Sequence, residues 1–339
     1  MSPGFDLKKI QVIDIPIERK VHFFKDLAAL FSLFSLFNKE RFDVIHTVSP
    51  KAGLLGMLAG YLSQTKNRFH TFTGQVWANS GGLSKTFFKA IDRLICRLAT
   101  KVFADSQSQI DFLIAEGVCN KSEITVLGNG SISGVNLLRF KPDSAARKNC
   151  RDSLAASEND IVFLFVGRVC RDKGIFDLLA AFDKMSSHFE KNIYLWIVGP
   201  DEGDIGPGLK EMYPDLKSHV KWIGASFEPE KYMAAADIFV LPSYREGFGS
   251  VVIEAAACKI PAIAYVTEGI TDAIEDQQTG LFVRKYDVED LASNMNLLAV
   301  NADLRQMLGK NAYERVLRSF SSDAVTAEWL TFYQKVLLK

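Results

Sequence analysis

The 339-residue sequence predicts an α/β protein with two doubly wound domains, and three observations support this. Short apolar runs rich in β-branched and aromatic residues alternate with longer segments of helical period, as in parallel sheets covered on both faces. Hydrophobic residues make up 48% of the chain and charged residues 24%, which is typical of a globular protein. The length is sufficient for two domains that each bury a core.

The N-terminal domain is expected to contain five strands and the helices between them. The strands cover residues 11–15, 42–46, 68–72, 101–104 and 123–127, and one of the helices covers 83–99. A doubly wound domain usually opens with a strand, a glycine-rich turn and a helix, whereas this chain opens with the irregular SPGFDLKK. We therefore expect the first strand–helix unit of this domain to be missing.

The C-terminal domain is expected to contain six strands. They cover residues 161–166, 194–198, 220–223, 238–241, 262–265 and 280–283, with helices over 174–186 and 249–258. Helical and strand periodicity lapses at 136–151, so we assign the two domains to residues 1–140 and 141–325. Residues 326–339 are expected to form a helix that packs back toward the N-terminal domain. Ligands of such folds bind at the carboxyl ends of the strands, and we expect the two domains to face each other across a cleft.

The charge is unevenly distributed along the chain. The formal net charge is zero, but residues 1–150 hold 20 basic against 12 acidic side chains, and residues 151–339 hold 20 against 28. A basic half can attract phosphates, anionic lipid or nucleic acid. The five cysteines are scattered without a C-x-x-C pair, and no uninterrupted apolar run is long enough for a membrane span. The N-terminal MSPGFDLKKI has no apolar core for a signal peptide. We expect a cytoplasmic protein without a zinc site.

The densest group of functional residues is SYREGFGSVVIE at 243–254, between a predicted strand and a predicted helix. Glycines at such a junction let backbone N–H groups approach a ligand, and the helix N-terminus favours an anion. Glu246 and Glu254 could then hold sugar hydroxyls. The alternative is a glycine turn followed by a helix with ordinary surface glutamates.

A second group is FVGRVCRDKG at 165–174, which also follows a predicted strand. Arg168 can pair with a phosphate through two N–H groups, and Lys173 supplies a point charge. Solvated basic residues in a loop are the alternative. Together the two groups predict a diphosphate site between Arg168, Lys173 and the helix that starts at Gly249.

These motifs resemble glycosyltransferase family 4. The similar patterns are V-G-R…K-G, then S-x-x-E-G-F-G…E, then the segment VTEGITDAIEDQQTGLFV at 266–283. In the N-terminal half, FDVIHTVSPKAGLLGMLAG and RFHTFTGQVW are similar to the branch that builds capsules, O-antigens and other bacterial surface glycans. The resemblance implies the GT-B architecture of two Rossmann-like domains, and transfer from a nucleotide sugar with retention of anomeric configuration.

The resemblance also implies roles for residues of the C-terminal domain. Arg168 and Lys173 would bind the donor diphosphate and stabilise the charge that develops on the leaving group, and Glu246 would contact the donor sugar. Glu254 would accept hydrogen bonds from the ribose, while Ile223 and Gly224 would flank the base. The remaining donor-binding residues are Gly247, Phe248, Gly249 and Ser250. No metal and no cofactor is expected.

The N-terminal domain departs from the family pattern. Many members have a His before a Gly where this chain has Thr73 and Gly74, and that His contacts the donor sugar. The nearby His70 is two residues from an equivalent position, so its side chain should point elsewhere. Lys51, at a strand-to-helix junction, is a candidate for the phosphate of the acceptor, and a surface lysine is the alternative.

Two helices of the N-terminal domain suggest contact with lipid. Residues 83–101 carry a basic residue at every fourth position, with an apolar face opposite, which suits either a surface helix or anionic headgroups. VHFFKDLAALFSLFSLF at 21–37 is apolar almost all round, so it is either buried or dips into a membrane.

The function expected from the sequence is a retaining glycosyltransferase. It would move a hexose or N-acetylhexosamine from a nucleotide sugar, with UDP as the nucleotide, to a lipid-linked precursor of a surface polysaccharide. A truncated or degenerate subunit that binds nucleotide with little turnover is the first alternative, and a sugar-nucleotide epimerase is the second. We expect the protein in the cytoplasm, with peripheral contact to the inner face of the membrane as an option, and no nucleic-acid partner.

Overall fold

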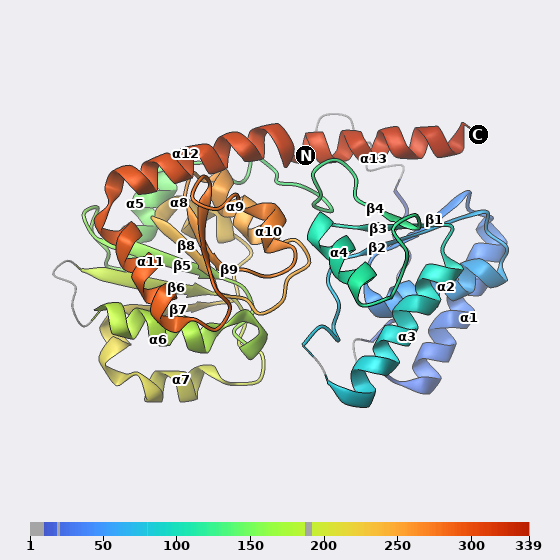
Figure 1. The fold of residues 1–339 in the computed structure, drawn as a ribbon, viewed down its shortest axis with the longest axis horizontal. Helices are drawn as coiled ribbons and strands as arrows, with labels where there is room; N and C mark the ends of the chain where they lie inside the picture. Colours follow the sequence, from blue (N-terminus) through green and yellow to red (C-terminus); the bar gives the residue numbers. More distant parts are fainter. Residues whose placement is uncertain (1–9, 19–20, 80, 187–191, 339) are drawn as a thin grey trace. The chain divides into compact units, whose positions relative to one another are not determined.

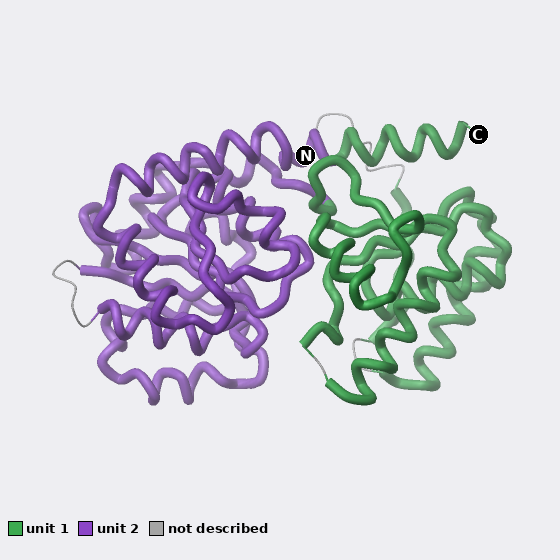
Figure 2. The backbone as a smooth tube through the Cα atoms, in the orientation of Figure 1, with its two compact units in different colours: residues 1–132, 326–339 green, residues 133–325 purple. Residues whose placement is uncertain are grey.

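The chain forms two compact units in a computed structural model that describes residues 10–18, 21–79, 81–186 and 192–338 (Figures 1 and 2). Unit 1 comprises residues 1–132 and 326–339, and unit 2 comprises residues 133–325. The sequence placed the boundary at 140/141, whereas the compact units meet at 132/133.

Unit 1 is built on a parallel sheet of four described strands in the order β1-β2-β3-β4. The strands are β1 (Val44–Thr47), β2 (Asn67–Phe72), β3 (Lys101–Ala104) and β4 (Ile124–Thr125). The strand expected at residues 11–15 is wrong, because residues 10–18 have no regular structure and Val12 is 88% exposed. A short apolar run does not make a strand when no neighbouring strand pairs with it, and Pro16 lacks an N–H group for a ladder.

Five helices accompany this sheet in the described part of unit 1. They are α1 (Phe23–Glu40), α2 (Pro50–Leu62), α3 (Gly82–Leu98), α4 (Gln107–Ala115) and most of α13 (Ser322–Leu337). Helix α13 lays Trp329 and Phe332 against Phe103, with ring centroids 5.0 and 4.9 Å apart. The C-terminal helix therefore packs on the N-terminal unit through these half-buried rings.

Helix α1 is neither a buried helix nor a surface helix with a polar outer face. Only Ala29 and Phe37 are buried, although the helix is apolar almost throughout. Phe23, Phe24 and Phe31 are 72%, 76% and 70% exposed. No helix among the described residues is long and apolar enough to cross a membrane.

Unit 2 contains one parallel sheet in the order β10-β9-β8-β5-β6-β7. The strands are β5 (Ile161–Val166), β6 (Ile193–Val198), β7 (Val220–Gly224), β8 (Ile238–Leu241), β9 (Ala262–Tyr265) and β10 (Gly280–Val283). All six expected strands are confirmed to within a residue. Five of them are continuous apolar runs with most of their residues buried, whereas β7 includes Lys221 and buries only Val220. The strand order reverses between β5 and β8, and this switch point is where doubly wound sheets bind ligands.

Eight α-helices and two short 3₁₀ helices surround this sheet in the part of unit 2 that the structure describes. The α-helices are α5 (Ser144–Ser153), α6 (Ile175–Ser186), α7 (Gly206–Met212), α8 (Pro229–Ala235), α9 (Ser250–Ala257), α10 (Ile270–Ala273), α11 (Val288–Val300) and α12 (Ala302–Ser319), and the 3₁₀ helices are η2 (Arg171–Lys173) and η3 (Pro214–Ser218). Helix α5 lies in the segment where periodicity lapses, and its polar residues have a structural use. Arg151 is buried and pairs with Asp237 at 2.6 Å, while Asp143 caps the helix.

Candidate active site

The loops that follow β5 and β8 meet at the switch point of unit 2. Gly174 has a φ of +67°, and a Cβ atom on it would lie 1.9 Å from the carbonyl oxygen of Pro242. The amide of Tyr244 donates to the carbonyl of Asp172 at 2.8 Å. This close approach requires glycine, and it brings the two predicted motifs side by side.

Lys173 and Glu246 form an ion pair across these two loops. Their side chains are only 17% and 12% exposed, so the pair is largely shielded from water. A shielded pair keeps more of its Coulomb attraction than a surface pair, and each partner holds the other in place. Two of the three predicted catalytic side chains are therefore neighbours in space.

Arg168, the third predicted catalytic residue, pairs with Glu202 from the loop after β6. Both side chains are exposed by more than a third, at 36% and 40%. Solvent screens such a pair, so the guanidinium can exchange Glu202 for a stronger anion at little cost. Arg168 lies at the same edge of the sheet as Lys173, since both follow β5.

The predicted glycine turn leads directly into α9. Gly249 adopts a φ of +75° as the N-cap residue, and Ser250 is the first residue of the helix. Phe248 is 3% exposed and packs edge-to-face on Phe320, with ring centroids 5.2 Å apart. The Phe248 side chain thus anchors the turn in the core, while the half-buried Gly247 and Ser250 remain at the surface of the site.

Glu254 lies one turn into α9 in a partly buried position with unusual electrostatics. Burial raises the pKa of its carboxyl to about 7, the nearby Arg139 opposes this shift and Glu230 adds to it. Arg139 itself is held by Glu230 at 2.8 Å. Glu254 is therefore poised to change charge near neutral pH.

The predicted base-flanking residues Ile223 and Gly224 end strand β7. Ile223 is half-buried, Gly224 is exposed, and the Gly224 carbonyl accepts from the amide of Gly199 at 2.8 Å. A Cβ atom on Gly224 would meet nothing within 4 Å, so there is space beside this strand end. Both residues lie at the same edge as the Lys173–Glu246 pair.

Sequence analysis missed three further charged side chains of unit 2. Arg245 pairs with Asp172 at 3.4 Å, and Lys285 donates to the carbonyl of Tyr244 at 2.7 Å. Arg139 adjoins Glu254 from a segment that was assigned to the other domain. Arg245 lies inside the 243–254 motif and could have been predicted from it. No motif in the sequence around Lys285 or Arg139 points to a site.

The predicted residues of unit 1 lie in different surroundings. Lys51 is the second residue of α2, and its ammonium contacts Asp26 at 2.5 Å and the carbonyl of Glu18 at 2.7 Å. Thr73 is half-buried directly after β2. His70 points elsewhere, as expected, because its Nδ1 lies 2.8 Å from the Thr47 hydroxyl in the interior.

The loop after β2 is anchored by the fully buried Trp77. Its indole N–H donates to Asp92 at 2.7 Å, and its ring stacks on Phe112 at 5.4 Å. Burial raises the pKa of Asp92 to about 6, and the bond from Trp77 lowers it in part. The loop that carries Thr73 is thus tied to α3 and α4.

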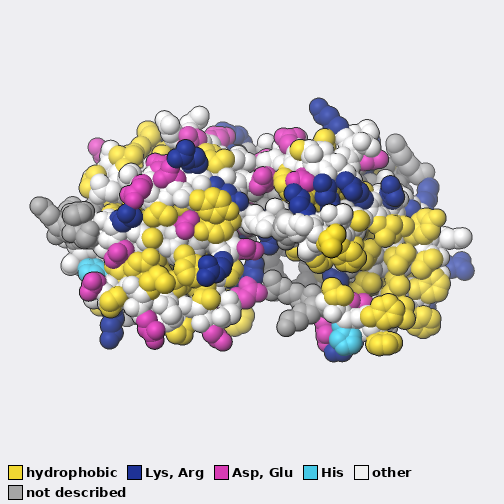
Figure 3. Space-filling view, turned by 60° about the horizontal axis from the view of Figure 1, so that its bottom comes forward, with side chains coloured by type: hydrophobic (Ala, Val, Ile, Leu, Met, Phe, Trp, Pro, Cys, Tyr) yellow, Lys and Arg dark blue, Asp and Glu magenta, His cyan; other side chains and the backbone are white. Residues whose placement is uncertain are grey.

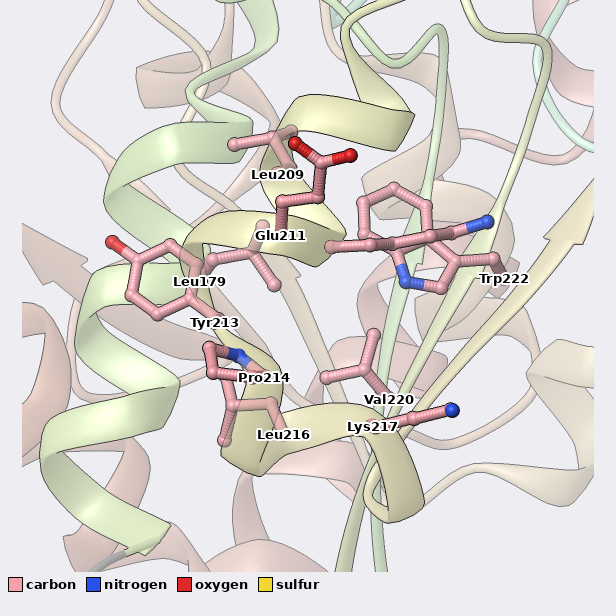
Figure 4. A pocket seen from close by; sticks show the side chains of 10 residues that line it. Leu179, Leu209, Glu211, Tyr213, Pro214, Leu216, Lys217, Val220 and Trp222 are labelled. Atoms are coloured by element: carbon pink, nitrogen blue, oxygen red, sulfur yellow. The ribbon is translucent and has the colours of Figure 1, made fainter.

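A pocket of about 450 Å³ lies elsewhere on unit 2, between α6, α7, η3 and β7 (Figure 4). Tyr213 and Trp222 stand on two sides of it, above the apolar Val220 and Leu216. Of the residues that the structure describes around this pocket, none is a predicted site residue. No group of three His, Cys, Asp or Glu side chains among the described residues is arranged to hold a metal ion.

Two family comparisons match the two halves of the chain. The family described as Glycosyl transferases group 1 matches residues 146–315, just over half of the chain, and the Glycosyl transferase 4-like domain matches residues 3–130. The chain belongs to the group 1 glycosyltransferases. This confirms the resemblance to glycosyltransferase family 4 that the motifs of unit 2 indicated.

Curated relatives of this glycosyltransferase match it over most of their length. The capsular polysaccharide biosynthesis glycosyltransferase CapM of Staphylococcus aureus is 29% identical over 95% of this chain and 84% of its own. The Escherichia coli UDP-Gal:alpha-D-GlcNAc-diphosphoundecaprenol alpha-1,3-galactosyltransferase is 26% identical over 89% of this chain and 78% of its own.

Solved structures confirm the GT-B fold of this glycosyltransferase. Sucrose-phosphate synthase from Thermosynechococcus elongatus superposes with a TM-score of 0.82 and 24% identity, over 95% of this chain and 81% of its own. HepE from Anabaena, in complex with UDP, superposes with a TM-score of 0.78 and 18% identity, over 91% of this chain and 82% of its own.

Proposed function

We propose that this glycosyltransferase moves a hexose or N-acetylhexosamine from a UDP-sugar to a lipid-linked precursor of a surface polysaccharide, with retention of configuration. The observation that supports it most is the shielded Lys173–Glu246 pair at the switch point of unit 2. The name of the Escherichia coli relative also supports it, because it describes transfer to a diphosphoundecaprenol-linked sugar.

In the proposed mechanism, Lys173 and Arg168 bind the diphosphate of the donor. Arg168 exchanges its exposed partner Glu202 for a phosphate oxygen, and Lys173 keeps its position through Glu246. Both cations then stabilise the negative charge that grows as the nucleotide leaves. Glu246 contacts hydroxyls of the donor sugar, and Glu254 accepts hydrogen bonds from the ribose. The acceptor attacks from the face of the leaving phosphate, which takes the proton of the acceptor hydroxyl.

A donor screen tests this function. UDP-, GDP- and ADP-sugars are titrated by calorimetry, and transfer to a lipid-diphosphate acceptor is followed with NMR assignment of the new anomeric bond. We expect binding of a UDP-sugar and an α-linked product from an α-linked donor. A donor that binds without transfer would identify a degenerate subunit, and release of an epimerised UDP-sugar without acceptor would identify an epimerase.

Two substitutions locate the chemistry. Lys173→Ala and Glu246→Gln should each lower kcat at least ~10²-fold, as expected for charge contacts made in the transition state. The matched control is Lys184→Ala, which removes an ion pair to Glu289 whose side chains are 50% and 77% exposed. Equal activity of all three variants would reject the site.

We also propose that unit 1 contacts the membrane that holds the acceptor, through α1. Figure 3 shows apolar side chains gathered over this part of unit 1. Leu27, Phe31 and Leu62 line an apolar hollow of about 250 Å³ beside the exposed Phe23 and Phe24. An exposed patch of this kind suits a lipid surface.

The basic face expected on α3 contributes less than the sequence suggested. Lys85 and Lys89 both pair with Glu116, at 2.8 and 2.7 Å. Of the basic residues in the first 150, Arg139 and Arg147 belong to unit 2, where they pair with acidic side chains. We therefore propose that apolar contact through α1 contributes more to membrane binding than the basic residues of α3.

Vesicle sedimentation separates these contributions. The double variant Phe24→Ser, Phe31→Ser should lose binding to vesicles, whereas Phe227→Ser, which alters a 98% exposed phenylalanine of unit 2, should not. Replacing anionic by neutral lipid should weaken binding only in part. Unchanged sedimentation of the double variant would contradict the role of α1.

A further inference from the structure

Two cysteines of unit 1 lie against one another on different segments. Cys96 is in the last turns of α3, and Cys119 follows α4 in a turn at 116–119. Both thiols line the same pocket, and each is the main influence on the pKa of the other. Cysteines that meet from segments 23 positions apart in the sequence are a candidate pair for a disulfide, and both are free thiols here.

Several contacts hold the turn at 116–119 against this face of α3. Arg93 donates through Nε to the carbonyl of Gly117 at 2.8 Å, and Lys85 and Lys89 hold Glu116. Arg93 precedes Cys96 by three positions, so the two side chains are neighbours on the helix surface. Cys96 therefore faces the turn that carries Cys119, and their proximity does not depend on the thiols alone.

The pair is accessible through a surface pocket of about 300 Å³. Both cysteines line it, together with Arg93 and Arg97. Cys119 is only 7% exposed, so a reagent must reach it through this opening. The guanidinium groups of Arg93 and Arg97 favour an anionic reagent in this pocket, and Glu123 is the acidic group that opposes them.

We propose that Cys96 and Cys119 form a reversible dithiol–disulfide site that exchanges with low-molecular-weight disulfides. The site rests on the geometry of unit 1 and not on the proposed transfer reaction. A hydrogen bond from Cys96 lowers the pKa of the Cys119 thiol, which supports Cys119 as the attacking group. The same bond and burial raise the pKa of the Cys96 thiol, which suits the second, resolving step.

The exchange is balanced in two steps. The Cys119 thiolate attacks one sulfur of an oxidised disulfide such as glutathione disulfide, forming a mixed disulfide and releasing one thiolate. Cys96 then loses its proton to solvent and attacks the Cys119 sulfur, which forms the internal disulfide and releases the second thiolate. The two cysteines lose two electrons and the reagent gains them. The new bond ties α3 to the turn after α4, so it should stabilise unit 1 against unfolding.

The test uses the full chain, reduced and then exposed to oxidised glutathione. We expect titratable thiols to fall from five to three, a mass lower by two hydrogen atoms and one cross-linked peptide pair containing Cys96 and Cys119. Dithiothreitol should reverse all three changes. Thermal unfolding should shift to higher temperature in the oxidised form.

Single variants establish the order of the steps. Cys96→Ser should accumulate a stable mixed disulfide at Cys119, whereas Cys119→Ser should leave Cys96 reduced. Cys150 and Cys170 are half-buried and serve as internal controls that should stay reduced. Five remaining thiols, or modification of the control cysteines without the internal cross-link, would overturn the proposal.

Discussion

Glu254→Gln should make unit 2 more stable above neutral pH while weakening donor binding. The carboxyl has a folded pKa of about 7 against an ordinary value of 4.5, mainly because burial disfavours its charged form. Because the folded pKa is the higher one, the contribution of Glu254 to the free energy of unfolding is fully present below pH 4.5. It is lost as the pH rises through 7. Linkage gives a loss of about 2.5 kcal/mol between pH 5 and pH 8.

The glutamine variant avoids this loss because it keeps the shape of the side chain and cannot ionise. Relative to wild type, its unfolding temperature should rise by about 5–10 °C more at pH 8 than at pH 5 for a unit of this size. Thermal unfolding at both values measures this, and calorimetry with UDP measures the accompanying loss of affinity.

A matched control isolates the effect of burial. Glu314→Gln alters a glutamate of α12 whose side chain is 57% exposed, so its difference from wild type should not depend on pH. If Glu254→Gln differed from wild type equally at pH 5 and pH 8, the electrostatic account of this residue would be refuted.

Three other substitutions test the packing that supports the site. Arg151→Met leaves the carboxylate of Asp237 with one cation fewer and should cost about 3 kcal/mol in urea unfolding; a cost near zero would contradict the buried pair. Gly174→Ala places a methyl group 1.9 Å from the carbonyl of Pro242 at a positive φ, so transfer activity should fall, and wild-type rates would exclude this contact. Phe248→Ala should cost about 3–5 kcal/mol in urea unfolding because the ring is 3% exposed, and a small effect would show that the turn is not anchored there.

The strands of unit 2 could be predicted because their information is local. Five of the six are continuous apolar runs, and such a run in a chain of alternating helices is buried in a parallel sheet; only β7 is interrupted, by Lys221. The segment at 11–15 shows the limit of this approach. Its short run of β-branched residues resembles a strand, but a strand also needs a neighbouring strand to pair with.

Helix α1 and helix α5 show the same limit in opposite directions. The apolar composition of α1 could not reveal that most of its aromatic side chains are left uncovered. The polar composition of α5 could not reveal that Arg151 would be buried against Asp237, 86 positions away in the sequence. Whether a side chain of either helix is covered depends on residues far away in the sequence, and local composition does not specify them.

For the active site, the sequence alone identified the residue types and the junctions that carry them. Glycines between strand and helix, the basic residues after β5 and the glutamates around α9 are local patterns with local physical reasons. Only the tertiary structure decided which of these side chains meet. The Lys173–Glu246 pair joins residues 73 positions apart, and the electrostatics of Glu254 depend on Arg139 from far upstream. Burial and Coulomb interaction depend on distance in space, and the order of residues along a chain does not specify that distance.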